Sequence, residues 1–191
     1  AINGLLYIRG QSKDYDIWRQ LGNTGWGWDD VLPYFIKAEN QERGKDDFHG
    51  VGGPLSVSDQ RIQLPLLNEF QNAAEEFGIP KTRDFNTGDN YGCGYFQVTE
   101  KDGFRCSTAV GYLNPIKNRN NLHIITNAHV KKINFENKIA KSVEYWQGNE
   151  LKKILANKEI ILSSGSIGSP QILQVSGIGN SDKLKNLGID M

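Results

Sequence analysis

The run of small residues from Ser163 to Ser169 is the feature that most constrains the fold of this chain. The residues just before it, 159–162, are short, largely apolar and rich in branched side chains, which predicts a buried strand. After the run, Ser169 fits an N-cap, Pro170 the first helical position, and Gly177 the residue just past a helix end. The sequence therefore predicts a strand, a tight glycine turn and a short helix.

A turn of this kind can have two purposes. It can bring backbone N–H groups and the positive end of a helix close to a ligand, with no Cβ in the way. That arrangement suits the pyrophosphate of a dinucleotide. In many α/β proteins, however, the same turn only packs a helix on a sheet, and the turn taken alone is compatible with both interpretations.

Composition excludes several classes of protein. The 191 residues are 38% hydrophobic and 10% aromatic, which indicates a globular core in one domain or a small pair. Because the formal net charge is zero, we expect no nucleic-acid partner. No apolar run approaches the roughly 18 residues of a membrane span. Cys93 and Cys106 are too few for a disulfide framework, which favours free thiols and a cytoplasmic location.

Periodicity and turn residues predict a helix-and-loop half followed by a sheet-building half, with a boundary near residue 99. The helices are expected at 12–21, 29–42, 64–77 and 107–113. The strands, besides 159–162, are expected at 122–126, 130–135 and 139–145. The last two should pair across the turn at 136–138.

Residues 165–179 resemble the second signature of the glucose–methanol–choline (GMC) oxidoreductases, a family of flavoenzymes. The string has a Gly and a small residue at its start, two variable positions, a Ser-Pro pair, two aliphatic residues and a closing Ser-Gly-Ile-Gly. Residues 1–10 resemble the latter half of the family's first signature, with Asn3, Tyr7 and Gly10 at the matching spacings. The resemblance covers essentially the whole chain. Because the sequence begins inside the first signature and its only Met is Met191, we expect an internal fragment of a longer enzyme.

The resemblance implies a mixed α/β fold with part of an FAD-binding Rossmann-like domain and part of a substrate or cap domain, both incomplete. Residues 1–12 would form a flavin-contacting segment of the FAD domain. Residues 13–98 would form the helix-and-loop cap portion. Residues 99–191 would return to the FAD domain, with its strands and the signature strand, turn and helix.

The cofactor implied by the resemblance is FAD. Asn3 and Gly4 match residues along the isoalloxazine ring, although Asn-Gly is also a common turn. The residues expected to contact FAD are Asn3, Gly4, Val130, Ser164, Gly165 and Ser166, with the backbone of Val130 beside the adenine. Ile2 stands where some members carry a histidine linked to the flavin, so we expect non-covalent binding.

No catalytic residue is expected within this chain, because the family's catalytic histidine would lie beyond Met191. His49, His123 and His129 have no metal-like spacing, and each is predicted to have a surface or packing role. Arg105 could pair with a carboxylate or a phosphate, or form a structural salt bridge.

The implied function is oxidation of the CH–OH group of a small-molecule alcohol by hydride transfer to flavin N5, as in the choline and alcohol dehydrogenase branch. The electron acceptor stays open. One alternative is an FAD-containing hydroxynitrile lyase on the same scaffold. Another is an isolated fragment without activity, since the chain lacks the Gly-x-Gly-x-x-Gly motif of a dinucleotide fold.

Overall fold

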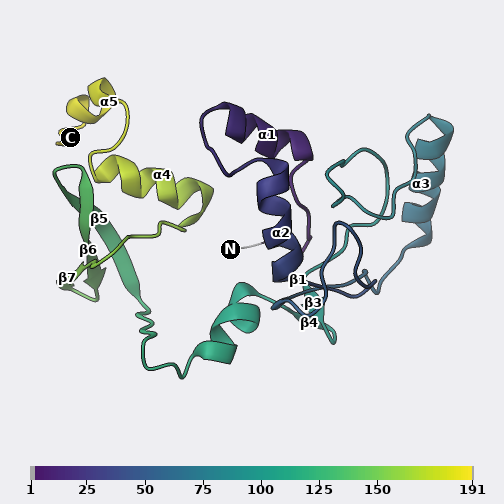
Figure 1. The fold of residues 1–191 in the computed structure, drawn as a ribbon, viewed down its shortest axis with the longest axis horizontal. Coiled ribbons are helices and arrows are strands. Elements are labelled where there is room, and N and C mark those ends of the chain that lie inside the picture. Colours follow the sequence, from purple (N-terminus) through teal and green to yellow (C-terminus); the bar gives the residue numbers. More distant parts are fainter. Residues whose placement is uncertain (1–2, 191) are drawn as a thin grey trace. The chain divides into compact units, whose positions relative to one another are not determined.

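The computed structural model describes residues 3–190 and shows two compact units, Ala1–Leu122 and His123–Met191 (Figure 1). The mixed helix-and-strand class predicted from the sequence is confirmed. The boundary between the units follows residue 122, whereas the assignment of 1–12, 13–98 and 99–191 to FAD-domain and cap portions stays a prediction. No helix among the described residues is both long and apolar enough to cross a membrane.

The first unit contains three helices, two small sheets and a short irregular helical segment. The helices are α1 (Ser12–Gln20), α2 (Trp28–Ala38) and α3 (Pro65–Glu76). The strands are β1 (Glu39–Gln41), β2 (Leu55–Val57), β3 (Glu100–Lys101) and β4 (Phe104–Arg105). A π-helical turn, Ala109–Leu113, occupies most of the segment 107–113 that was predicted as a short helix, and a 3₁₀ turn, Asn114–Ile116, follows it.

Helices α1 and α2 are held together by aromatic packing. The buried ring of Tyr15 lies with its centroid 5.3 Å from Trp18, 5.6 Å from Trp28 and 5.7 Å from Phe35. Helix α1 begins at Ser12, as predicted, and its N-cap is Gln11, whose N–H donates to the Asp14 carboxylate. These aromatic contacts thus fix how α1 packs against α2, which the local sequence signals of each helix do not determine.

Helix α2 ends at Ala38, four residues before the predicted end, and this prediction was wrong. The chain continues directly into β1, which pairs in parallel with β2. The Gly53 N–H donates to Glu39 O, and a Cβ at Gly53 would lie only 2.5 Å from that oxygen. Because this glycine loop lies so close, it supplies hydrogen-bond partners for the backbone of β1 that a longer helix would otherwise supply.

Helix α3 lies within one residue of its predicted bounds, with Pro65 at the first helical position. Its apolar stripe faces solvent in the described part of the chain: Leu66 is 78% exposed and Phe77 86% exposed. The amphipathic pattern therefore predicted the helix correctly although no tertiary partner covers it among residues 3–190.

The second unit contains an antiparallel meander of β5 (Ala128–Glu136), β6 (Ile139–Gln147) and β7 (Glu150–Leu155). The predicted hairpin is confirmed, and its turn residues Asn137 and Lys138 both have positive φ. Strand β7 was missed. The predicted strand at 122–126 was wrong, because these residues have no strand partner within the described chain.

Helices α4 (Gly165–Val175) and α5 (Ser181–Asn186) complete the second unit. Helix α4 starts at Gly165, four residues before the predicted N-cap at Ser169, so Pro170 lies inside it. The Ser169 hydroxyl instead accepts a hydrogen bond from the Ser164 N–H at 3.0 Å. The helix packs against β5, where the Ile133 N–H donates to Ser176 Oγ at 2.8 Å.

The strand predicted at 159–162 does not form among the described residues, and this prediction was wrong. No other strand pairs with this segment, and Ile161 is 79% exposed. A single extended segment cannot satisfy its backbone groups without a neighbour. The prediction that Gly177 lies just past the helix end is confirmed, because it follows the C-cap of α4 and has a φ of 88°.

Candidate cofactor-binding site

Val130 on β5 and Ser164 before α4 line the same cavity in the second unit. The cavity has a volume of about 430 Å³ and lies between β5, β6 and one side of α4, from the residue before the helix to its last residue. Its lining residues are Ala128, His129, Val130, Lys131, Trp146, Ser164, Gly168, Gln171, Ile172 and Val175. The fold thus brings together two residues that the sequence placed separately, one near an adenine and one near a pyrophosphate.

The N-terminus of α4 fits an anionic group. Its first turn carries no acidic residue, as is also true of α3, whereas α1, α2 and α5 each have at least one there. The first N–H groups of a helix have no intrahelical partner and carry a partial positive charge. Gly168 adds no side chain to the cavity wall. The chemistry of this cavity therefore fits the pyrophosphate and adenosine part of FAD.

Gly165 and Ser166 form the first turn of α4 and do not line that cavity. Gly165 has a φ of 84°, a backbone conformation that residues with a side chain rarely adopt. A Cβ built on it would meet nothing within 4 Å. A larger cavity of about 780 Å³ lies beside the hairpin turn and the end of α4, and it contains none of the six predicted residues.

Asn3 and Gly4 lie in the first unit, and both are exposed. Gly4 lines a cavity of about 470 Å³ that also includes Leu6, Ile62 and Val98. Asn3 Oδ1 accepts hydrogen bonds from the Leu5 N–H at 3.1 Å and from Arg105 Nη1 at 2.6 Å. The predicted partners of Arg105, a carboxylate or a phosphate, are thus replaced by an amide. Ile2, on which the prediction of non-covalent binding depends, lies outside the described residues.

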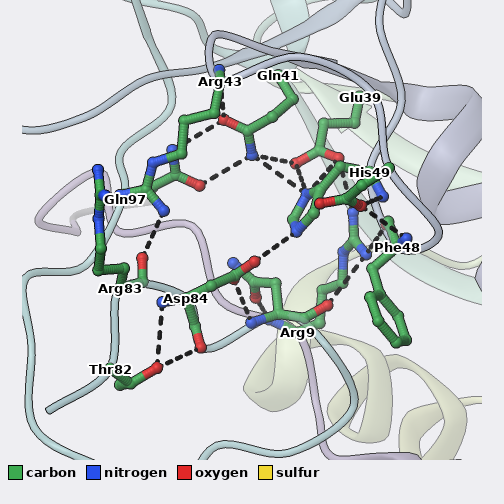
Figure 2. Close-up of polar contacts among 12 residues, drawn as sticks. Arg9, Glu39, Gln41, Arg43, Phe48, His49, Thr82, Arg83, Asp84 and Gln97 are labelled. Carbon is green, nitrogen blue, oxygen red and sulfur yellow. Dashed lines mark hydrogen bonds and ion pairs between the residues drawn. The ribbon is translucent and has the colours of Figure 1, made fainter.

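A buried polar network lies in the core of the first unit, and its members are far apart in the sequence. We call it the Arg9–Glu39 network; it consists of Arg9, Glu39, Gln41, His49, Asp84 and Gln97 (Figure 2). Arg9 Nη2 lies 2.9 Å from Glu39 Oε2, and both side chains are at most 1% exposed. Gln41 and Gln97 exchange amide hydrogen bonds of 2.9 and 2.8 Å. The charges and amides of this network therefore satisfy one another, and all of its side chains except the partly exposed Asp84 are buried.

Carboxylates face both ring nitrogens of His49 (Figure 2). Nδ1 lies 2.9 Å from Glu39 Oε2, and Nε2 lies 2.7 Å from Asp84 Oδ2. Because an ionised carboxylate only accepts hydrogen bonds, both nitrogens must donate, and the ring is an imidazolium. Burial lowers the pKa of His49, but the hydrogen bonds to Asp84 and Glu39 outweigh it and raise the pKa to about 9. Burial alone would raise the pKa of Asp84, yet the hydrogen bond from His49 holds it below its usual value.

The histidines occupy very different places. His49 is 2% exposed inside the Arg9–Glu39 network, whereas His123 and His129 are exposed. Sequence reasoning predicted a surface or packing role for His49, of which the buried role is the correct one, but it missed the network, for which no local signal exists. Among residues 3–190 no group of three or more His, Cys, Asp or Glu side chains is placed to hold a metal ion. Both cysteines are free thiols, Cys106 buried and Cys93 half-buried.

Comparison with known proteins gives a consistent result. The GMC oxidoreductase family model matches residues 1–190. Human mitochondrial choline dehydrogenase is 40% identical over 189 residues, which is 99% of this chain and 32% of that protein. Alcohol dehydrogenase [acceptor] of Pseudomonas putida is 41% identical over 192 residues, covering 99% of this chain and 35% of that protein.

A solved FAD-dependent oxidoreductase from Chaetomium thermophilum superposes with a TM-score of 0.89 and 34% identity, covering all of this chain and 35% of that one. The chain thus spans about a third of the length of the relatives it matches. A match over residues 1–190, which include both signature-like segments, leaves no doubt about descent. This chain belongs to the GMC oxidoreductase family.

Proposed function

We propose that this chain supplies part of the FAD site of an oxidoreductase that acts on the CH–OH group of a small-molecule alcohol. The observation that carries the proposal is the shared cavity of Val130 and Ser164 beside an acid-free helix N-terminus. Family membership and the choline and alcohol dehydrogenases among the relatives support the same conclusion. Choline and simple primary alcohols are therefore the first substrates to test.

Each predicted residue would have a distinct part in holding the cofactor. Ser164, which lines the cavity, would receive the pyrophosphate together with the free N–H groups of the first turn of α4, where Gly165 and Ser166 lie. The backbone of Val130 would lie beside the adenine, and Asn3 and Gly4 beside the flavin ring. When bound, FAD would supply the hydride acceptor for oxidation of the carbinol carbon. We propose that it binds without a covalent link.

The proton of the alcohol needs a base, and His49 is unsuited to that role. Both of its ring nitrogens donate to carboxylates, so neither has a free lone pair. Its burial also keeps substrate away from it. We therefore propose no base from among the residues described here, and the chain's contribution is cofactor binding and orientation.

The test uses the protein expressed from its complete reading frame and purified with excess FAD. After gel filtration we expect stoichiometric flavin in the visible spectrum, released from the protein by acid precipitation. Choline or a primary alcohol should bleach the flavin in the absence of oxygen. Reoxidation by oxygen or by a quinone would then identify the acceptor class.

Two results would contradict the proposal. A protein that retains no flavin would remove the cofactor assignment altogether. If the protein retains flavin, the flavin stays oxidised with every alcohol and the protein cleaves a hydroxynitrile, the lyase alternative would be the correct one.

A further inference from the structure

The guanidinium of Arg105 donates hydrogen bonds to both the backbone and the side chain of one residue, Asn3. Nη1 donates to Asn3 Oδ1 at 2.6 Å, and Nη2 donates to the Asn3 carbonyl oxygen at 3.3 Å. The planar fork of an arginine can hold two acceptors in a fixed mutual orientation, which a lysine cannot do. The contact therefore fixes the side-chain rotamer of Asn3 together with the carbonyl that precedes Gly4.

The backbone immediately after Gly4 is strained. Leu5 has a φ of 70°, a left-handed conformation that costs a non-glycine residue about 1–2 kcal/mol. It persists because its surroundings hold it: the Leu5 N–H donates to Asn3 Oδ1, and the Leu5 carbonyl accepts from the Thr99 N–H and hydroxyl. Strain of this kind is kept only where neighbouring contacts over-determine the conformation.

Arg105 does not form an ion pair with the acidic residue opposite it in the sheet. In the β3–β4 ladder it lies directly opposite Glu100, on the same face of the two strands. No ion pair between Glu100 and Arg105 is present within the described chain, and the guanidinium contacts the neutral amide instead. Both Arg105 and Asn3 are exposed, and exposed contacts of this type contribute less than about 1 kcal/mol to stability. Stabilisation of the fold is thus a poor reason for this contact.

We infer that Arg105 is a positioning residue, which holds Asn3 and Gly4 in the single conformation that the flavin ring needs. This inference rests on the proposed function, in which Asn3 and Gly4 lie along that ring. Arg105 acts through Asn3 rather than on substrate. Its loss should loosen the segment 3–5 and weaken flavin binding while the fold stays intact.

The first experiment measures the dissociation constant of FAD, by flavin fluorescence, for the full-length protein and three variants. Arg105→Ala should weaken binding by about threefold to fivefold, the size expected for losing an exposed contact of this type. Arg105→Lys should recover only part of the loss. The control is Arg119→Ala, because the exposed Arg119 guanidinium has no hydrogen bond or ion pair within residues 3–190; it should bind FAD normally. All variants should keep the wild-type melting temperature in the absence of FAD.

The second experiment tests whether Arg105 works through Asn3. In an Asn3→Ala background, Arg105→Ala should cost less FAD affinity than it does in wild type, because only the hydrogen bond to the backbone carbonyl of residue 3 remains to be lost; a double-mutant cycle measures the difference. Guanidinium at concentrations well below those that unfold proteins should restore FAD binding to Arg105→Ala, whereas ammonium should not. In the flavin-free protein, the Leu5 N–H should exchange with solvent faster in Arg105→Ala than in wild type.

The outcomes separate the two proposals. Wild-type protein that binds no FAD would overturn the proposed function and this inference with it. Normal FAD affinity and unchanged Leu5 exchange in Arg105→Ala, with wild type binding FAD, would overturn this inference alone. Additive losses in the double variant would also overturn it, because Arg105 would then act independently of Asn3.

Discussion

The Nε2 atom of His49 lies 2.7 Å from the Asp84 carboxylate, in a contact that joins two loops 35 residues apart in the sequence. With Glu39 on the other side of the ring, the imidazolium carries a charge that balances its neighbours. Arg9 and His49 together supply two positive charges against those of Glu39 and Asp84. The Arg9–Glu39 network is therefore neutral only while His49 is protonated.

Stability should accordingly fall on the alkaline side. The pKa of His49 is about 9 in the folded protein and 6.5 unperturbed, so its contribution is complete below pH 6.5 and disappears as the pH rises through 9. The full effect is about 3 kcal/mol. Urea denaturation from about pH 5 to about pH 10 measures it. His129→Gln should keep this slope and His49→Gln should remove it, while a flat wild-type profile from pH 6.5 to 9 would contradict the prediction.

On the acid side, the lowered pKa of Asp84 has the opposite sign. Its contribution is complete above the unperturbed value of 3.8 and is lost as the pH falls through the folded value. The network should thus be most stable between about pH 4 and about pH 6.5. Asp84→Asn should flatten the acid limb of the same denaturation series, and an unchanged acid limb would argue against this assignment.

Breaking the ion pair between Arg9 and Glu39 should be costly. Arg9→Met leaves a buried carboxylate short of one positive partner, and we expect a loss of about 3–5 kcal/mol in the free energy of unfolding. The matched control is Arg19→Met, whose pair with Asp16 is half-exposed and should cost less than about 1 kcal/mol. Adding Glu39→Gln to Arg9→Met should recover part of the loss. Equal effects of the Arg9 and Arg19 substitutions would refute a special role for the buried pair.

Gly165→Val should reduce FAD retention beyond what its effect on stability explains. The positive φ of Gly165 predicts a strain cost of about 1–2 kcal/mol for any side chain. Gly148→Val is a matched control, because Gly148 also has positive φ and open space for a Cβ, but lies in the β6–β7 turn. Flavin content and melting temperature, measured in parallel in the full-length protein, should show similar destabilisation in both and flavin loss in Gly165→Val alone. Equal flavin content in the Gly165→Val and Gly148→Val proteins would show that Gly165 has only a structural role.

Lys138→Gly should stabilise the β5–β6 hairpin. Lys138 has a φ of 65° in the two-residue turn after Asn137, where glycine adopts this conformation without strain. We expect a gain of about 0.5–1 kcal/mol in the free energy of unfolding, by urea denaturation. Lys131→Gly, within β5, should destabilise instead. A loss of stability in Lys138→Gly would show that the lysine side chain makes a contact of its own.

The elements that the sequence predicted well are those with local signals. Helix α3 has a proline start and a periodic apolar stripe, and its predicted bounds were correct within one residue. The hairpin at 136–138 is fixed by a turn between two alternating segments. In both cases the residues that decide the structure are neighbours in the chain, so the pattern is readable without the fold.

The failed predictions concern segments whose structure depends on distant partners. The apolar residues 159–162 look like a strand, but a strand exists only where another strand pairs with it. The residues 39–41 look like the end of a helix, yet they pair with 55–57 because a glycine loop brings that strand close. Local propensity was overridden in each case by what the rest of the chain supplied or did not supply.

The sequence alone determined the family and the segments that form helix α3 and the β5–β6 hairpin, whereas the six residues expected to contact FAD stay a prediction from the resemblance. Tertiary structure alone decided which polar groups meet: Arg105 with Asn3 across 102 residues, Arg9 with Glu39 across 30, and His49 with Asp84 across 35. Hydrogen bonds and charge pairs act over a few ångströms, and these distances arise only when loops distant in the chain are packed together.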